Sequence, residues 1–368
     1  MHRREFCRRV AMAGGSLMLA PLIEACARSE VTLTRSEPTA TATPVSPATP
    51  HPTTAPTPTV MPQPTEEATM ANIALVKTED RADGVRQAIE LLGLNPARGK
   101  RVLLKPNLNS ADEAPGSTHS DILRALVVKL SDMGARAVSV ADRSGMGDTR
   151  TVMQRKGVLE LADELGFTAV VLDELEERDW VIRQSKDTHW PRGYAVPRLL
   201  LDAECVVQTC NLKTHRFGGH FTLSLKNSVG FAAKTVNGSG YDYMHELHSS
   251  PYQRQMIAEI NTAYTPALIV MDGVEAFVDG GPDRGKKVKS EVVLAGTDRI
   301  AMDAVGVAIL RLFGTTREVS LGGVFEQAQI ARAVELGLGV DSPARIAIAT
   351  GDAESEVYAQ QIREVLMR

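Results

Sequence analysis

Short apolar runs alternate with longer amphipathic stretches from residue 71 to the end of the sequence. The pattern predicts strands over 72–77, 101–104, 137–141, 169–172, 206–210, 268–271, 292–295 and 345–349. It predicts helices over 82–92, 120–133, 158–165, 252–263, 300–312, 324–336 and 354–366. Strands that alternate with helices in this way are typical of βαβ units. We therefore expect an α/β domain over 71–368, with a mostly parallel, Rossmann-like layered sheet and helices on both of its faces.

The stretch 211–250 interrupts this alternation. It is rich in glycine and only weakly periodic, so the pattern predicts no helix or strand in it. The alternation resumes at residue 252.

Residues 1–26 have the pattern of a cleavable signal peptide. A basic stretch precedes a moderately apolar run over 10–23, and about 14 residues are too few to span a membrane as a mature helix. Arg3, Arg4 and Phe6 resemble the twin-arginine export signal, which serves proteins that cross the membrane already folded. An ordinary Sec leader is the alternative. In either case we expect an exported protein.

The end of this leader contains a candidate lipidation site. The sequence LIEAC, which ends at Cys26, resembles a lipobox, in which the cysteine becomes the acylated first residue of a lipoprotein. Plain cleavage of the A-x-A sequence after Ala27 is the alternative. The first reading predicts a membrane anchor through Cys26 and a location on the extracytoplasmic face of the cell membrane, and the second predicts a secreted protein.

Residues 27–70 are expected to form a tether between the leader and the domain. Within it, residues 31–69 are mostly Thr, Pro, Ala and Ser, a composition that cannot bury apolar surface and that favours polyproline II. Fully extended, residues 31–69 reach roughly 120 Å. A disordered segment with no required reach is the alternative.

Composition excludes several classes of partner and cofactor. The 368 residues are 43% hydrophobic and carry a formal net charge of −4, and no basic stripe interleaved with aromatic residues occurs, so we expect no nucleic-acid partner. Only 4 cysteines are present and none forms a C-x-x-C pair, so no iron–sulfur cluster or structural zinc site is expected. Cys205 and Cys210 have an odd separation on one predicted strand, which places them on opposite faces and argues against a disulfide.

Polar side chains follow most of the predicted strands at the point where each strand ends. Lys105, Asp142 and Asp272 come directly after apolar runs. Lys213 and His215 follow another run, and because they are two residues apart they share a face if that strand continues. Ligands of open parallel sheets bind beyond the carboxyl ends of the strands. We therefore expect one pocket lined by Lys105, Asp142, His215, Lys226 and Asp272.

The residue types predict how these side chains would act on a ligand. Lysine and asparagine bind carboxylate or phosphate groups, so the expected substrate-binding residues are Lys105, Asn107, Lys226 and Asn227. Imidazole and amine groups transfer protons, so the expected catalytic residues are His119, Lys213 and His215. Carboxylates hold divalent cations through their oxygens, so the expected ligands of a divalent metal are Asp142 and Asp272.

These motifs, taken in order, resemble those of the DUF362 family, a domain of unknown function. The resemblance covers most of 72–351 and is carried by Lys105-Pro106-Asn107, Thr118-His119, Lys213-Thr214-His215, Lys226-Asn227 with Gly230, Asp272-Gly273, and the stretch from Asp298 to Asp303. It implies the α/β fold but no established reaction. Some members of the family carry an added ferredoxin-like cluster domain, and this chain lacks the cysteines for it.

Two functions are compatible with the sequence. The first is an enzyme that acts on a small anionic molecule, either a metal-assisted hydrolase or transferase, or a proton-transfer enzyme of the isomerase type. The second is a tethered solute-binding or sensing module without catalysis. The sequence has no G-x-S-x-G elbow, no Walker loop and no G-x-G-x-x-G after a strand, which argues against α/β-hydrolase, P-loop and NAD chemistry.

Overall fold

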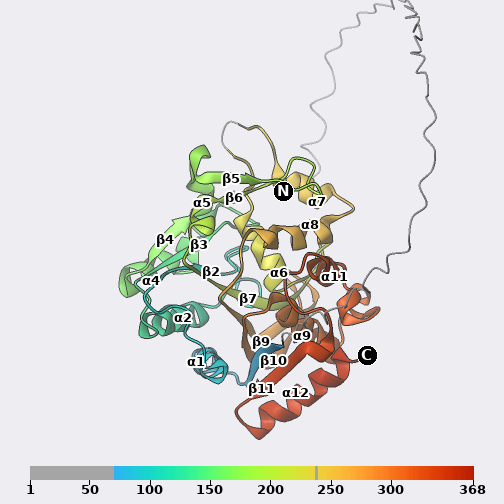
Figure 1. Cartoon of the computed structure of the whole chain (residues 1–368). Helices are drawn as coiled ribbons and strands as arrows, with labels where there is room; N and C mark the ends of the chain where they lie inside the picture. Colours follow the sequence, from blue (N-terminus) through green and yellow to red (C-terminus); the bar gives the residue numbers. More distant parts are fainter. Residues whose placement is uncertain (1–69, 237–238) are drawn as a thin grey trace, which may run out of the picture. The chain divides into compact units, whose positions relative to one another are not determined.

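The computed structural model describes residues 70–236 and 239–368 (Figure 1). The predicted signal peptide, the lipidation candidate Cys26 and the predicted tether up to residue 69 lie outside the described residues. No helix of the described part is both long enough and apolar enough to cross a membrane.

Within the described residues, one sheet of nine strands forms the centre of the domain. Its order is β11-β1-β10-β9-β7-β2-β3-β4, and β8 pairs with β7. The bounds are β1 Ala71–Lys77, β2 Arg101–Lys105, β3 Ala137–Asp142, β4 Thr168–Val171, β7 Cys205–His215, β8 His220–Thr222, β9 Leu268–Gly280, β10 Gly285–Gly296 and β11 Ile346–Thr350. The pairs β1–β11, β2–β3, β2–β7, β3–β4 and β7–β9 are parallel, and β1–β10, β9–β10 and β7–β8 are antiparallel. The predicted mostly parallel sheet is confirmed.

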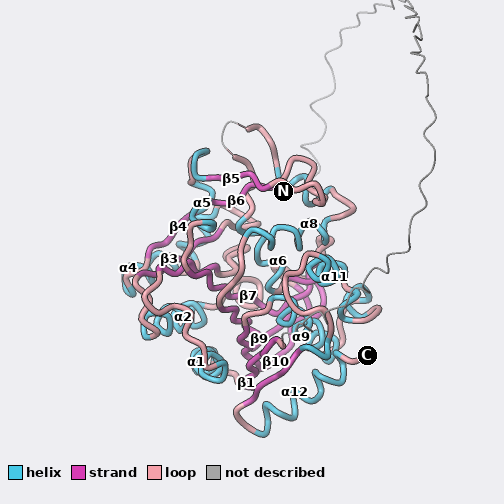
Figure 2. The backbone as a smooth tube through the Cα atoms, in the orientation of Figure 1, coloured by secondary structure: helices cyan, strands magenta, loops and turns pink. Residues whose placement is uncertain are grey.

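Helices cover both faces of this sheet (Figure 2). Successive residues of β1 point to opposite faces, as the pleat requires: Ile73 and Leu75 pack with α9 and α12, whereas Ala74 and Val76 pack with α1 and α2. The longer helices are α1 Arg81–Leu92, α2 Ser120–Asp132, α3 Thr149–Arg155, α4 Val158–Leu165, α7 Tyr243–Ser249, α8 Gln253–Ile260, α9 Arg299–Leu312, α11 Ala328–Glu335 and α12 Ala353–Leu366. The α/β class and the two helical layers therefore agree with the prediction.

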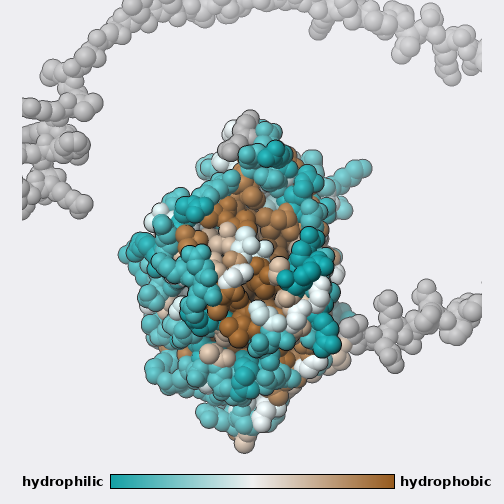
Figure 3. All heavy atoms as spheres, turned by 90° about the vertical axis from the view of Figure 1, so that its left-hand side faces the viewer, coloured by the Kyte–Doolittle hydropathy of each residue, from teal (hydrophilic) through white to brown (hydrophobic). Residues whose placement is uncertain are grey.

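A third apolar cluster lies beside the β2–β4 side of the sheet. It packs under the hairpin of β5 Trp180–Arg183 and β6 Tyr194–Pro197, which is followed by α5 Arg198–Leu201. Figure 3 shows the left-hand side of Figure 1, where α4 and β4 lie, and hydrophobic residues gather there in a hollowed middle between hydrophilic margins. Edge strand β4 is thus only partly covered, with Ala169 and Val170 half-buried.

Several predicted elements have a different form in the structure, and α3, β5, β6 and α5 occur where no element was predicted. The predicted helix 324–336 is divided into the 3-10 turn Val324–Glu326 and α11, because the backbone of Gln327 is not helical (φ −59°, ψ 123°). The Gln327 side chain donates to the carbonyls of Glu318 and Leu321. The strands predicted over 268–271 and 292–295 are the inner halves of the long hairpin β9–β10. The outer half of β10 is mostly exposed and contains Lys286, Lys287 and Lys289, so it lacks the continuous apolar run of a central strand.

Elements also occur in the stretch 211–250, where none was predicted. The strand β7 continues to His215, and β8, α6 Ser224–Asn227 and α7 follow it. All residues of β7 are buried, including polar ones. A buried strand is recognised in a sequence by its pattern of apolar residues. Polar residues that are buried because they bind a ligand or one another interrupt that pattern, so the elements of this stretch could not be predicted from it.

Candidate functional site

The predicted site residues gather where β2 ends and its neighbour β7 continues. Pro106 directly after Lys105 has no N–H for the sheet and ends β2. Lys105 pairs with Gln208 of β7, so Lys213 and His215 extend beyond the end of β2. A pocket lies at this end of the sheet, and Lys105, Lys213 and His215 line it.

Lys105 and Asp142 form a buried ion pair at the floor of the pocket. Lys105 Nζ lies 2.6 Å from Asp142 Oδ1, and the two side chains are 1% and 2% exposed. Asp142 also accepts the backbone N–H groups of Leu108 and Arg143, each at 2.7 Å. Burial lowers the pKa of Lys105 and raises the pKa of Asp142, and the attraction between the two charges opposes both shifts. Gly230 packs directly on this pair, where a Cβ atom would collide with both charged groups.

Lys213 is held at its tip by two neutral oxygens. Its Nζ donates to Asn107 Oδ1 at 2.8 Å and to the carbonyl of Gly116. The side chain is fully buried. Burial, and then the charge of Lys226, lowers the pKa of Lys213 to about 7, so this amine exchanges its proton near neutral pH.

Lys226 is presented by α6, which a buried carboxylate holds in place. Asp303 of α9 accepts the backbone N–H of Ser224 at 2.7 Å and that of Leu225 at 3.3 Å. Lys226 Nζ makes no hydrogen bond or ion pair with any residue that the structure describes. Burial, and then the charge of Arg143, lowers the pKa of Lys226 to about 8. At pH 7 this lysine is therefore still mostly protonated, and it lines the cavity with its charge uncompensated.

Two asparagines link these cations. Asn107 Nδ2 donates to Asn227 Oδ1 at 3.1 Å, and Asn227 Nδ2 donates to the carbonyl of Thr209 at 3.1 Å. Lys105 Nζ approaches the same Asn227 oxygen at 3.4 Å. Both asparagines line the pocket, but their amide groups hold protein partners, so in this structure they position the lysines.

Three residues that line the pocket each contain a buried polar atom without a partner. His215 Nδ1, Thr222 Oγ1 and Asn109 Nδ2 have no hydrogen-bond partner among the described residues. Burial, and then the charges of Lys226 and Lys213, holds the pKa of His215 well below its usual value, so its imidazole is neutral. Buried polar atoms without partners are rare in folded proteins, so three of them beside one cavity distinguish this part of the structure.

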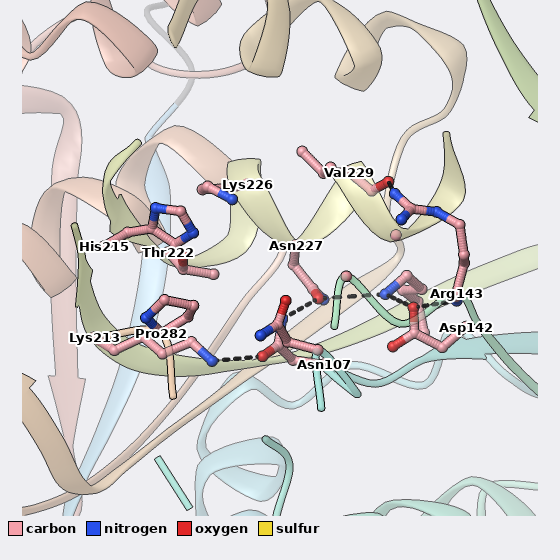
Figure 4. Close-up of a pocket in the computed structure, with 14 residues that line it drawn as sticks. Asn107, Asp142, Arg143, Lys213, His215, Thr222, Lys226, Asn227, Val229 and Pro282 are labelled. Atoms are coloured by element: carbon pink, nitrogen blue, oxygen red, sulfur yellow. Dashed lines mark hydrogen bonds and ion pairs between the residues drawn. The ribbon is translucent and has the colours of Figure 1, made fainter. Parts of the chain in front are cut away.

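The cavity is small and continues into a larger hollow. Its volume is about 50 Å³, and the adjoining hollow of about 230 Å³ shares His215, Lys226 and Arg143 with it. Figure 4 shows Lys213, Lys226 and His215 on one side of the cavity, Asp142 and Arg143 on the other, and the two asparagines between them. Room for one water needs about 10–15 Å³ on such a measure, so the inner cavity accommodates a group of a few atoms.

Sequence reasoning missed three lining residues with polar or charged side chains: Asn109, Arg143 and Thr222. Arg143 is buried, and its guanidinium donates to the carbonyls of Ala232 at 2.7 Å and Val229 at 2.6 Å. Its position directly after the predicted site residue Asp142 is the feature of the sequence that could have identified Arg143 as a lining residue. Thr222 lies in the stretch where no element was predicted, so no signal was available for it.

His119 lies outside the pocket. It is the N-cap of α2, and its Nδ1 accepts the backbone N–H of Asp121 at 3.2 Å. The residues that line the cavity do not include it. The structure therefore corrects its expected place among the catalytic residues and gives it a helix-capping role, which is common for polar side chains at this position.

Asp272 also lies outside the pocket, so the predicted metal pair is wrong. Its carboxylate accepts Arg81 Nε at 3.0 Å and the backbone N–H of Val274 at 3.1 Å. Three strand spacings separate β9 from β3, which places Asp272 roughly 14 Å from Asp142. One cation cannot bridge that distance. Over residues 70–236 and 239–368, no group of three or more His, Cys, Asp or Glu side chains is arranged to hold a metal ion.

The two cysteines of β7 are free and buried. Cys205 packs in the cluster with α1 and α2, and Cys210 packs in the cluster with α9 and α12. They lie on opposite faces of the sheet, as their odd separation predicted.

Three comparisons place this chain among known proteins. Residues 102–308 match the family described as "Domain of unknown function (DUF362)". The thylakoid-associated protein sll1697 of Synechocystis sp. is 27% identical over 219 residues, which cover 58% of this chain and 64% of that protein. The lactate racemase apoprotein from Thermoanaerobacterium thermosaccharolyticum has a TM-score of 0.36 and 17% identity, over 59% of this chain and 53% of that one. The two matches therefore cover less than two thirds of the length of sll1697 and of the lactate racemase apoprotein.

Proposed function

We propose a function from the pocket alone, because the chain belongs to the DUF362 family, a domain of unknown function, and this family name assigns no reaction. In our proposal the pocket binds the carboxylate or phosphate group of a small molecule, and the protein is an enzyme that moves a proton on that molecule. The supporting observation is the charge around the cavity. Three cationic side chains, Lys105, Arg143 and Lys226, and the amine of Lys213 line it, against the single carboxylate of Asp142.

The geometry supports a division of roles. Lys226 has no protein partner, and an ionised lysine in a buried site needs an anion. Lys213 is the group best suited to exchange a proton, because its pKa of about 7 lies near the working pH. His215 lies beside it in the pocket as a neutral imidazole, which can accept a proton. The inner cavity takes the anionic group and the atoms next to it, and the adjoining hollow takes the rest of the substrate.

Lys226→Met is expected to weaken the binding of sulfate roughly 10- to 100-fold at pH 7, because a hydrogen bond to a charged group contributes about 1.5–3 kcal/mol. Sulfate keeps its charge from pH 6 to 9, so the wild-type affinity should fall about tenfold from pH 7 to pH 9 as Lys226 loses its proton. Isothermal titration calorimetry measures both effects. Lys186→Met, at an exposed position, is the matched control; equal affinities in the two variants would contradict the proposal.

Turnover is tested separately from binding. Small carboxylic acids are incubated with the protein in D2O, and NMR follows exchange of the hydrogen next to the carboxylate. Exchange that Lys213→Met abolishes while sulfate binding persists would support the enzyme. Binding without exchange of any acid in the panel would favour a solute-binding module. That second candidate has one supporting observation: the carboxylate of the pocket, Asp142, is already held by Lys105 and two backbone N–H groups.

We also propose that the protein is exported and anchored to a membrane. The support is the sequence pattern at Arg3, Arg4 and Cys26. Cys26→Ala is expected to move the protein from the membrane fraction to the soluble fraction of the expressing cells, and immunoblotting of both fractions measures this. A wild-type protein that is already soluble and begins at Ala27 or Arg28 would overturn the lipid anchor.

A further inference from the structure

The three lysines of the pocket differ in the partners of their ammonium groups. Lys105 Nζ has an anionic partner in Asp142 at 2.6 Å and a second acceptor in the Pro106 carbonyl at 2.7 Å. Lys226 Nζ has no partner among the described residues. Lys213 Nζ has two partners, both neutral oxygens, on Asn107 and Gly116. Lys105 is therefore a cation paired with a carboxylate, whereas Lys226 is a cation without a partner among the described residues.

The partners of Lys213 match a neutral amine. A neutral amine has two N–H donors and one lone pair, whereas an ammonium group has three donors. Two acceptors satisfy the amine completely and leave its lone pair free. In the part of the chain that the structure describes, Lys213 has no carboxylate within ion-pair distance. Its low pKa agrees with this geometry, and a desolvated lysine next to another cation is a recognised form of activated nucleophile.

We infer that the Lys213 amine forms a Schiff base with the carbonyl group of a small oxo acid whose carboxylate is held by Lys226. The inference rests on the proposed function, since it needs an anion at Lys226, and it names the substrate class of the same site. Figure 4 shows the two lysines on the same side of the cavity together with His215. The cavity opens to the larger hollow at Lys226 and His215, which gives an oxo acid a way in.

The reaction steps balance with the groups present. The lone pair of Lys213 Nζ forms a bond to the carbonyl carbon, and a proton that the nitrogen loses passes to the carbonyl oxygen to give a carbinolamine. A second proton, taken up from the solvent, lets this hydroxyl leave as water and leaves a protonated C=N bond. The neutral imidazole of His215 then takes a proton from the neighbouring carbon, and the electron pair left behind moves toward nitrogen to form an enamine. This is the proton transfer of the proposed function, made easier by the positive nitrogen.

The experiment traps the imine on the complete protein. Pyruvate and acetoacetate are each added with sodium borohydride, which reduces C=N to a stable secondary amine, and peptide mass spectrometry locates the adduct. We expect at least tenfold more adduct on Lys213 than on the exposed Lys186. Acetone, which lacks the carboxylate, should give at least tenfold less adduct on Lys213, and sulfate should protect Lys213 in the wild-type protein.

The outcomes separate this inference from the function on which it rests. If sulfate binds at Lys226 but Lys213 carries no more adduct than Lys186, the Schiff base is wrong and the anion site stands. If sulfate does not bind either, both fail. Protection by sulfate is measured without any substitution, so a variant that fails to fold does not decide the result. An adduct on Lys226 in place of Lys213 would also overturn the assignment.

Discussion

Asp142→Ala is expected to lower the free energy of unfolding by about 3–5 kcal/mol, because it leaves the Lys105 ammonium buried without its counter-charge. Two backbone N–H groups, those of Leu108 and Arg143, lose their acceptor in the same change. For a domain of this size the melting temperature should fall by roughly 5–8 °C. Calorimetry or circular dichroism of the purified protein measures the shift.

Two further variants show whether burial is the cause. Glu164→Ala breaks the ion pair with Arg124, in which both side chains are about half exposed, and should lower the stability far less than Asp142→Ala, because water and salt screen an exposed ion pair. Adding Lys105→Met to Asp142→Ala removes the orphaned charge and should recover part of the lost stability. An Asp142→Ala protein as stable as the Glu164→Ala protein would show that Lys105 is not held as a buried cation.

The central sheet could be predicted because burial leaves a local pattern. Strands β2 and β3 are covered on both faces, so each is a continuous apolar run. The polar residue that ends each run marks its carboxyl end, and parallel pairing brings these ends together. This is why Lys105, Asp142, His215 and Lys226, which are distant in sequence, were expected around one pocket and do line it. Their chemical roles stay predictions.

The predicted places of Asp272 and His119 were wrong, because the first depends on the order of the strands in the sheet and the second on a local hydrogen bond. Asp272 also follows an apolar run, but β9 lies on the far side of β7 from β2, and Arg81 of α1 takes its carboxylate. Nothing local to Asp272 indicates either fact. His119 begins a helix, where capping of the N–H at Asp121 competes with any role in a pocket. The sequence pattern cannot decide between these uses.

Asp303→Asn is expected to change how the stability of the protein depends on pH. Burial raises the pKa of Asp303 to about 8, whereas an aspartate in an unfolded chain has a pKa of about 3.9. Between these values the folded state keeps a proton that the unfolded state has released, so the stability that Asp303 contributes is complete below about pH 4 and is lost as the pH rises to about 8. Asparagine carries no charge at any pH and keeps an oxygen for the N–H groups of Ser224 and Leu225.

The difference in unfolding free energy, Asp303→Asn minus wild type, should therefore rise with pH by roughly 1.4 kcal/mol per unit between about pH 5 and pH 7.5, and level off above pH 8. Urea unfolding over pH 5–9 measures it. Lys213 and Lys226, whose lowered pKa values make stability rise with pH, are present in both proteins and cancel in the difference. Asp163→Asn, at an exposed position of α4, controls for the lost charge and should stay within about 0.5 kcal/mol of wild type. A flat difference would mean that Asp303 is ionised in the folded protein, held by the two N–H groups of α6.

Asp303→Asn should also leave the affinity for sulfate unchanged, because α6 and its Lys226 remain in place. Asp303→Ala removes the acceptor of the two N–H groups and should therefore weaken sulfate binding.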